Sequence, residues 1–130
     1  MKKCTFIKTY NNTNRVKSIE DIKNTTIDKN NVVMIISKYI LLKQDGYCET
    51  LTDDNGNKFE ICFHKLKSDW IATEKTTGLI VCFSKTRKSC FNMVCDRYLN
   101  NIQSAACLAK YNKLRVEVEK AYELLENKNE

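Results

Sequence analysis

The chain has 130 residues, and its 22 Lys and Arg against 16 Asp and Glu give a formal net charge of +6. This length fits a single domain over residues 1–130 that buries its own core without metals or disulfides. The moderate charge and an acidic stretch at 117–130 favour a local anion site over a long nucleic-acid groove. The lack of any long apolar run predicts neither a signal peptide nor a membrane span, so we expect a cytoplasmic protein.

Residues 1–30 form a polar segment, rich in Asn, Thr and Lys, in which only short elements are predicted. A strand is expected from Thr5 to Tyr10 and a helical turn around Ser18 to Lys23. The apolar, β-branched run at 31–44 predicts the first strand of a β-sheet region over 31–84. Asp45 and Gly46 then predict a turn into the strand at 47–53.

The next strand, over residues 58–64, alternates in character, which is typical of a sheet with one buried and one wet face. The buried face is expected to hold Phe59, Ile61 and Phe63, and the wet face Lys58, Glu60, Cys62 and His64. A second hairpin joins 69–74 to 79–84 through the turn "KTTG". Apolar residues on both faces of 79–84 favour a covered strand.

Two helices are predicted over residues 85–126. Ser84 is expected to cap the first helix, which follows apolar spacing at Phe91, Val94, Cys95, Tyr98 and Ile102. The second runs from about Ser104 to Glu126. The fold class is therefore α+β: an antiparallel β-meander of four or five strands followed by two carboxy-terminal helices.

The second helix carries an apolar stripe at alternating spacings of four and three. Its members are Cys107, Tyr111, Leu114, Val118, Ala121 and Leu125. This spacing is typical of a coiled-coil seam, which favours a homodimer or a higher oligomer. The same stripe would also suit packing on the chain's own sheet, with Leu108, Val116 and Tyr122 as a second apolar fringe, and the two alternatives stay open.

Seven cysteines are present, an odd number with no C-x-x-C pair, so we expect most of them to be thiols. The best metal candidate is Cys48, Cys62 and His64. If Asn55 and Gly56 form a two-residue turn, Cys48 faces Phe63, and the two thiols then lie on opposite faces. Structural cysteines without a metal are therefore expected, because a closed zinc site needs four converging ligands.

The segment "FSKTRKSC" at 83–90 places cations where a helix begins. Ser84 would cap, and Lys85, Thr86 and Arg87 would occupy the first turn, where free backbone N–H groups favour a phosphate. Phe83 offers a ring for stacking a base, and Trp70 across the hairpin offers a second. The alternative is a set of exposed cations beside a core phenylalanine.

The longer segment "WIATEKTTGLIVCFSKTRKSCFNMV" at 70–94, with the sheet before it and two helices at the end, resembles the phage anti-Thoeris proteins. These are sponges for cyclic ADP-ribose isomers, and the resemblance covers roughly the last two thirds of the chain. It implies a homo-oligomer that sequesters a cyclic nucleotide immune signal without cleaving it. It also implies adenine contact by Phe83, a polar contact by Asn92 and phosphate contacts by Arg87 and Arg115.

An enzyme is the least supported class, and no cofactor is expected. His64 is the only histidine and is predicted to be solvated, while Cys82 and Cys90 beside the cationic turn have no base near them in the sequence. The second candidate is a small basic inhibitor of a bacterial nuclease, or a nucleic-acid-binding protein. Such a protein would spread Lys and Arg along one face, whereas a nucleotide sponge concentrates cations and an aromatic ring in a pocket.

Overall fold

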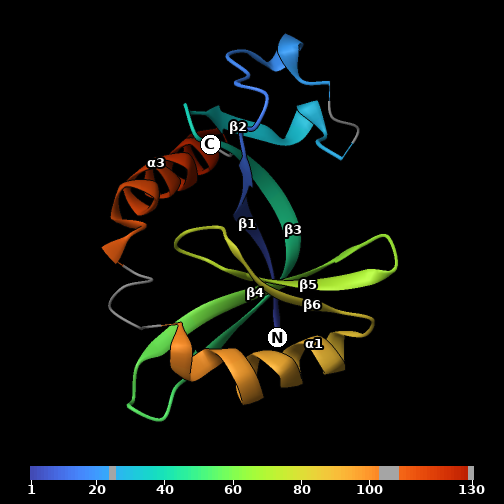
Figure 1. Cartoon of the computed structure of the whole chain (residues 1–130), viewed down its shortest axis with the longest axis vertical. Coiled ribbons are helices and arrows are strands. Elements are labelled where there is room, and N and C mark those ends of the chain that lie inside the picture. The colour runs from blue at the N-terminus through green and yellow to red at the C-terminus, as the bar shows by residue number, and fades with distance from the viewer. Residues whose placement is uncertain (24–25, 103–108, 129–130) are drawn as a thin grey trace.

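Six antiparallel strands and a carboxy-terminal helical region make up the computed structural model, which describes residues 1–23, 26–102 and 109–128 (Figure 1). The expected α+β class is confirmed, with one strand more than predicted. The sheet order is β1-β3-β4-β5-β6, and β2 also pairs with β3. The strands are β1 (Lys2–Asn11), β2 (Val32–Ile35), β3 (Tyr39–Thr52), β4 (Lys58–Leu66), β5 (Asp69–Glu74) and β6 (Ile80–Ser84).

The helical segments lie at two separate places on the sheet. They are η1 (Ile19–Asp21), η2 (Lys29–Asn31), α1 (Arg87–Met93), the π-helix η3 (Val94–Tyr98), η4 (Leu99–Asn101) and α3 (Asn112–Lys128). α1 contacts β5 and β6, whereas α3 contacts β1 and β2 (Figure 1). The second helix was expected from Ser104, but α3 begins at Asn112. Positions 103–108, with Cys107 and Leu108, lie outside the described residues.

The predicted turn at Asp45-Gly46 is wrong, because both residues lie inside β3. A Cβ added at Gly46 would lie 2.3 Å from the carbonyl oxygen of Phe63 on β4. Glycine is therefore required here by the close approach of two strands and not by a change of chain direction. The chain reverses earlier, where Ile36 N–H donates to Tyr39 O at 2.9 Å, and this reversal divides the run 31–44 into β2 and β3.

The turn between β3 and β4 is longer than the predicted two residues. The Asp53 carboxylate accepts hydrogen bonds from the N–H groups of Asn55 and Asn57, and Gly56 has a φ of 85°. This Asx-type closure occupies residues 53–57 and shifts the register by one residue from the predicted one. Cys48 consequently lies opposite Cys62 and not opposite Phe63.

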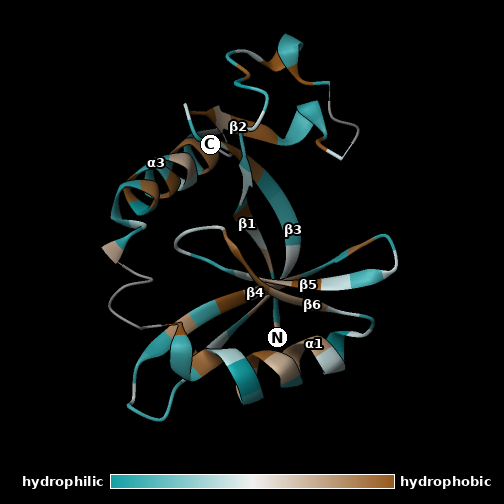
Figure 2. Cartoon of the chain, in the orientation of Figure 1, coloured by the Kyte–Doolittle hydropathy of each residue, from teal (hydrophilic) through white to brown (hydrophobic). Residues whose placement is uncertain are grey.

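Apolar residues fill three clusters, two of which lie under helices. Beneath α1 and η3 the cluster contains Phe59, Ile61 and Phe63, as the alternation of β4 predicted. Beneath α3 the cluster contains Ile7, Leu41, Leu114, Val118 and Ala121. Figure 2 shows that α3 carries both apolar and hydrophilic residues along its length.

The predicted coiled-coil seam is therefore wrong as an interface over its described residues, because these pack on the chain's own sheet. Leu114, Val118 and Ala121 are buried against β1 and β3, and Tyr111 and Leu125 are partly buried beside them. The stripe had two possible partners, and the sheet is the one that covers it. The outer side of α3 differs, since Val116 is 52% exposed.

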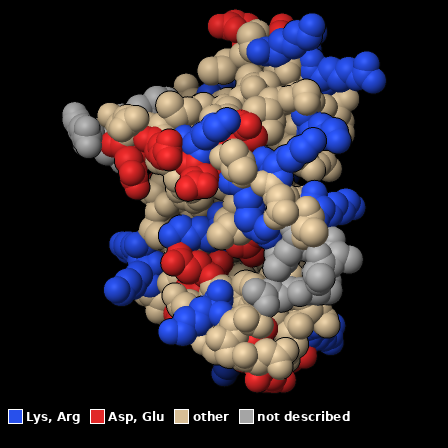
Figure 3. Space-filling view, turned by 90° about the vertical axis from the view of Figure 1, so that its left-hand side faces the viewer, with Lys and Arg blue, Asp and Glu red and all other residues tan. Residues whose placement is uncertain are grey.

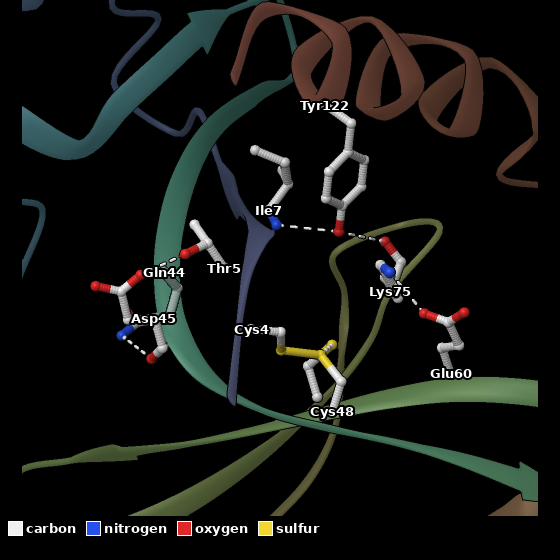
Figure 4. Close-up of a disulfide and its surroundings, with 10 residues drawn as sticks. Cys4, Thr5, Ile7, Gln44, Asp45, Cys48, Glu60, Lys75 and Tyr122 are labelled. Atoms are coloured by element: carbon white, nitrogen blue, oxygen red, sulfur yellow. Dashed lines mark hydrogen bonds and ion pairs between the residues drawn. A yellow bond between two sulfur atoms is a disulfide. The ribbon is translucent and has the colours of Figure 1, made fainter. Parts of the chain in front are cut away.

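Tyr122 fastens α3 to β1 and to the turn after β5 (Figure 4). Its hydroxyl accepts a hydrogen bond from Ile7 N–H at 3.1 Å and donates to Lys75 O at 3.0 Å. The turn after β5 also meets β1 directly, because Thr9 N–H donates to Gly78 O at 2.8 Å. Helix, turn and first strand are thus held together by polar contacts between backbone and side chain.

Candidate functional site

The junction between β6 and α1 is formed by the cationic segment that the sequence singled out. Thr86 has extended backbone angles, and its side-chain oxygen accepts a hydrogen bond from Ser89 N–H at 3.0 Å. Thr86 is therefore the N-cap, and the prediction of Ser84 as the cap is wrong. The Ser84 hydroxyl instead shares a hydrogen bond with the Ser89 hydroxyl, which fixes the end of β6 against the first turn of α1.

Arg87 is held over two aromatic rings. Its guanidinium carbon lies 5.3 Å from the ring centroid of Tyr47 and 5.8 Å from that of Trp70, and these two rings are 6.3 Å apart. Contacts of this kind position an arginine while leaving its N–H groups able to bind an anion. We name Tyr47, Trp70, Ser84, Lys85 and Arg87 the junction cluster.

Lys85 adds a second, loosely held cation to the junction cluster. Its ammonium group lies 3.0 Å from a carboxylate oxygen of Asp69, and its side chain is 80% exposed. An ion pair this exposed contributes little to stability, so the lysine can exchange its partner at small cost. Lys88 is exposed nearby on α1, which gives the junction a local excess of positive charge.

Phe83 does not lie on the same face as the rest of the predicted site. It pairs with Ile71, whereas Trp70 pairs with Ser84, and neighbouring positions along a strand point to opposite faces. The covered strand that was predicted here is wrong, because β6 is an edge strand on which Phe83 is 65% exposed and Ile80 is also exposed. The alternative in which Phe83 belongs to the core is excluded by this exposure.

Asn92 and Thr86 line a separate shallow pocket on the outer side of α1. Lys88, Asp96 and Arg97 also line this pocket, whose volume is about 380 Å³. Its charges are mixed, because one carboxylate faces two cations. A ligand bound to the junction cluster would therefore reach Asn92 only by extending over the first turns of α1.

Arg115 lies away from the junction cluster, in contrast to the implied role beside Arg87. Its Nε donates to Thr76 Oγ1 at 3.1 Å, and its Nη1 donates to Asn112 Oδ1 at 3.0 Å. Thr76 follows the end of β5, whereas Trp70 stands near its start, so Arg115 and Arg87 make contacts at opposite ends of this strand, whose span from Trp70 to Glu74 is about 13 Å. The sequence could not reveal this separation, since it depends on which strands α3 covers.

The cleft around Arg115 is the larger one, with a volume of about 640 Å³. Three carboxylates line it, from Glu60, Glu74 and Glu119. Glu60 pairs with Lys75 at 2.6 Å, and Glu74 accepts hydrogen bonds from the residues of the β5–β6 turn. Size alone would favour this cleft, but its three carboxylates are matched by three cations, from Lys58, Lys75 and Arg115, so it has no excess of positive charge and the junction cluster is the better anion site.

The face of β4 predicted to be wet is covered at Cys62 and His64. His64 is 4% exposed, its ring packs 5.7 Å from that of Phe6, and neither ring nitrogen has a hydrogen-bond partner among the described residues. Burial, and then the nearby Lys8 ammonium, lower the pKa of His64 to about 4. The solvated histidine that the sequence predicted is thus a buried neutral imidazole.

One disulfide was not foreseen: Cys4 on β1 is bonded to Cys48 on β3. The other cysteines that the structure describes are thiols. Cys82 and Cys90, the pair beside the junction, are both buried, and burial raises the pKa of Cys90 to about 12 and also raises the pKa of Cys82. Neither thiol is activated as a nucleophile, because a nucleophilic cysteine needs a lowered pKa.

Tyr47 is the functional residue that sequence reasoning missed. It follows Asp45-Gly46, so the predicted turn placed it at the start of a new strand rather than within a long one. In the register of the structure, Tyr47 lies opposite Phe63 on β4. This register also brings the Tyr47 ring beside Arg87 at the start of α1. An aromatic residue directly after a glycine inside a strand was the one available signal.

Comparisons of the chain with protein-family models, with curated proteins and with solved structures found no match. The resemblance to anti-Thoeris proteins therefore stays a prediction. Among the helices of the described residues, none has the length and apolar character that crossing a membrane requires.

Proposed function

We propose that the protein binds a phosphate-bearing cyclic nucleotide, such as a cyclic ADP-ribose isomer, at the junction cluster and sequesters it without cleaving it. The observation that carries the proposal is the placement of Arg87 over Tyr47 and Trp70. In this reading the protein acts in the cytoplasm of a phage-infected bacterium, as its sequence resemblance implies, and removes an immune signal from solution.

The chemistry of the junction cluster suits a phosphate. A guanidinium offers paired N–H donors that match two phosphate oxygens, and stacking on Tyr47 and Trp70 reduces the entropy that Arg87 loses on binding. Lys85 can leave its exposed pair with Asp69 and add a point charge. The aromatic rings of the same cluster would lie beside the nucleotide, and bases stack favourably on flat aromatic surfaces.

Binding is favoured over catalysis by the state of the possible acid–base groups. His64 is the only histidine of the chain, and it is buried on the opposite face of the sheet from Trp70 and Arg87. Burial holds the thiols of Cys82 and Cys90 in the protonated form. The groups that the sequence offered for catalysis therefore do not provide proton transfer at the junction cluster.

A nucleic-acid-binding surface is less well supported. In the face shown in Figure 3, Lys and Arg are interspersed with Asp and Glu and do not form a continuous stripe. A protein that follows a nucleic-acid backbone needs such a stripe, because each contact neutralises a successive phosphate. The mixed pattern favours one local anion site.

The homo-oligomer belongs to the same proposal, but its interface must differ from the predicted seam. Edge strand β6 has a strand neighbour on one side only and presents the exposed Ile80 and Phe83. Two copies that meet along β6 would cover these side chains. Light scattering tests this interface: Ile80→Lys should give a monomer, and the control Val116→Lys on the outer side of α3 should not.

Calorimetric titration with purified cyclic ADP-ribose isomers tests the function. We expect saturable binding, and heating the complex should release a ligand that chromatography shows to be unchanged. A chemically altered ligand would mean an enzyme. Absence of binding to every isomer, together with salt-sensitive binding of a labelled oligonucleotide, would replace the proposal by the nucleic-acid alternative.

A further inference from the structure

Three cysteines from adjacent strands meet on the face of the sheet opposite Trp70. Cys4 lies on β1, Cys48 on β3 and Cys62 on β4, and their sulfur atoms all lie within 4.8 Å of one another. Cys48 and Cys62 are direct cross-strand partners whose sulfurs are 2.8 Å apart, while Cys4 is bonded to Cys48 (Figure 4). One disulfide thus leaves a third sulfur in contact with it.

This arrangement removes the reason for which the sequence disfavoured a metal. That reason was a register that put Cys48 and Cys62 on opposite faces, and the turn at Asp53 shifts the register by one. Three sulfurs from three strands approach the spacing that a tetrahedral metal imposes on its ligands. Soft thiolate donors of this kind select Zn²⁺ over the hard cations Mg²⁺ and Ca²⁺.

His64 lies on the same face, two positions after Cys62 on β4, so the two side chains point the same way from Cα atoms roughly 7 Å apart. Its ring nitrogens do not belong to the group of sulfur atoms that lie within 4.8 Å of one another, so the side chain must turn towards them to bind a metal. Both nitrogens are buried without a partner among the described residues. A neutral imidazole is the form that binds metals.

The surroundings of the cluster suit a structural metal site. Phe6 packs against His64 and Cys62 is fully buried, whereas Cys4 and Cys48 are half-buried, so water is excluded from one side of the cluster. A bound metal would displace the proton of the Cys62 thiol and neutralise the resulting thiolate.

We propose that, after a thiol reductant has opened the Cys4–Cys48 bond, the thiolates of Cys4, Cys48 and Cys62 and the imidazole of His64 bind one Zn²⁺ ion. Reduction transfers two electrons and two protons to the disulfide while two reductant thiols form a disulfide of their own. Metal binding then releases the three thiol protons. The disulfide and the metal compete for the same sulfurs, so this face of the sheet holds one or the other.

Titration with Co²⁺ tests the site, because Co²⁺ replaces Zn²⁺ in tetrahedral sites and reports its ligands by colour. The full chain is reduced with a phosphine, desalted under nitrogen and titrated. We expect one equivalent of Co²⁺ to give thiolate charge-transfer bands and intense visible bands, which one equivalent of Zn²⁺ abolishes. The oxidised chain should bind at least about a hundredfold more weakly, since only two donors remain.

Matched variants identify the ligands. Cys4→Ser near the amino terminus and Cys62→Ala should each lose the charge-transfer bands, whereas Cys95→Ala, which removes a thiol outside the cluster, should keep them. His64→Leu should shift the visible bands and weaken binding. Circular dichroism checks that each variant is folded. If Cys62→Ala does not fold, Cys4→Ser still tests the thiolate ligands.

Either of two results would overturn the proposal. The first is a reduced wild-type chain that shows no thiolate-to-cobalt band, and the second is binding of Co²⁺ by Cys4→Ser and Cys62→Ala like that of the wild type. An unchanged spectrum in folded His64→Leu would remove the histidine from the ligand set and contradict the four-ligand site.

Discussion

The sheet has a half that α3 covers and an open edge at β6, and similar residues are buried in the first and exposed in the second. Under α3, apolar side chains such as Val118 are buried, and the Tyr122 hydroxyl has a partner on either side. At β6 and the start of α1, Phe83 is 65% exposed and Arg87 lies on the surface over two rings. The apolar pattern of α3 thus serves the fold, and the residues left open at the edge are the candidates for binding.

The largest expected effect lies in the covered half. Val118→Asp places a carboxylate in an apolar cluster, so we expect it to lower the free energy of unfolding by about 4 kcal/mol or more. The control is Val116→Asp, two positions away on the exposed side of α3, which should change stability by less than about 0.5 kcal/mol. Urea denaturation measures both. A stable Val118→Asp monomer would instead return this stripe to the role of a dimer seam.

A pH dependence should distinguish the two regions next. The pKa of His64 is about 4 in the folded protein and near its ordinary 6.5 in the unfolded chain, so unfolding takes up a proton between these values. Stability should therefore fall as the pH drops from 6.5 to about 4, by about 3 kcal/mol in all, and then level off for this group.

Denaturation of the oxidised protein across this pH range provides the measurement. Lys8 on β1 is the charged group that acts on His64, and Lys8→Met should make the loss smaller. His64→Leu should remove the dependence. The same slope in wild type and His64→Leu would show that the histidine is not the group responsible.

A smaller effect is expected from the Tyr122 hydroxyl. Tyr122→Phe leaves Ile7 N–H and Lys75 C=O without that partner and should cost about 2 kcal/mol in the free energy of unfolding. Tyr98→Phe removes a hydroxyl from an exposed side chain and serves as the control. Equal thermal shifts in the two variants would contradict the fastening role of Tyr122.

The smallest effect is expected at the open edge. Lys85→Ala breaks an ion pair with Asp69 whose lysine is largely exposed, so stability should change by less than about 0.5 kcal/mol. Thermal melting with and without added salt measures this. A large, salt-sensitive loss of stability would mean that the cations of the junction hold the fold together and are not reserved for a ligand.

Local sequence predicted most of the strands and the order of elements. The buried side of the alternation around Ile61 and the presence of a turn at 53–57 are decided by neighbours in the chain, and both were confirmed. Gly46 was misjudged, because a glycine that allows two strands to approach has the same local signature as one in a turn. The turn length, set by the Asp53 carboxylate, then changed which cysteines face each other.

The candidate site was predicted in its residue types and missed in its geometry. Exposed cations at 85–88 follow from their chemistry, whereas the support of Arg87 by Tyr47 depends on a long-range register. Phe83 and Trp70 were grouped because Trp70 lies across the predicted hairpin from Phe83, but adjacent paired positions place them on opposite faces. The position of Arg115 depends on where α3 packs on the sheet, and the periodicity of the sequence does not reveal that place.

The most direct test of the central claim is calorimetric titration of a cyclic ADP-ribose isomer into wild type, Arg87→Ala and the control Lys113→Ala, an exposed cation on α3. Arg87→Ala should lose at least about tenfold in affinity at an unchanged melting temperature, because charge-assisted hydrogen bonds to phosphate disappear. Lys113→Ala should bind like the wild type. Wild-type affinity in folded Arg87→Ala would contradict a phosphate site at the junction cluster.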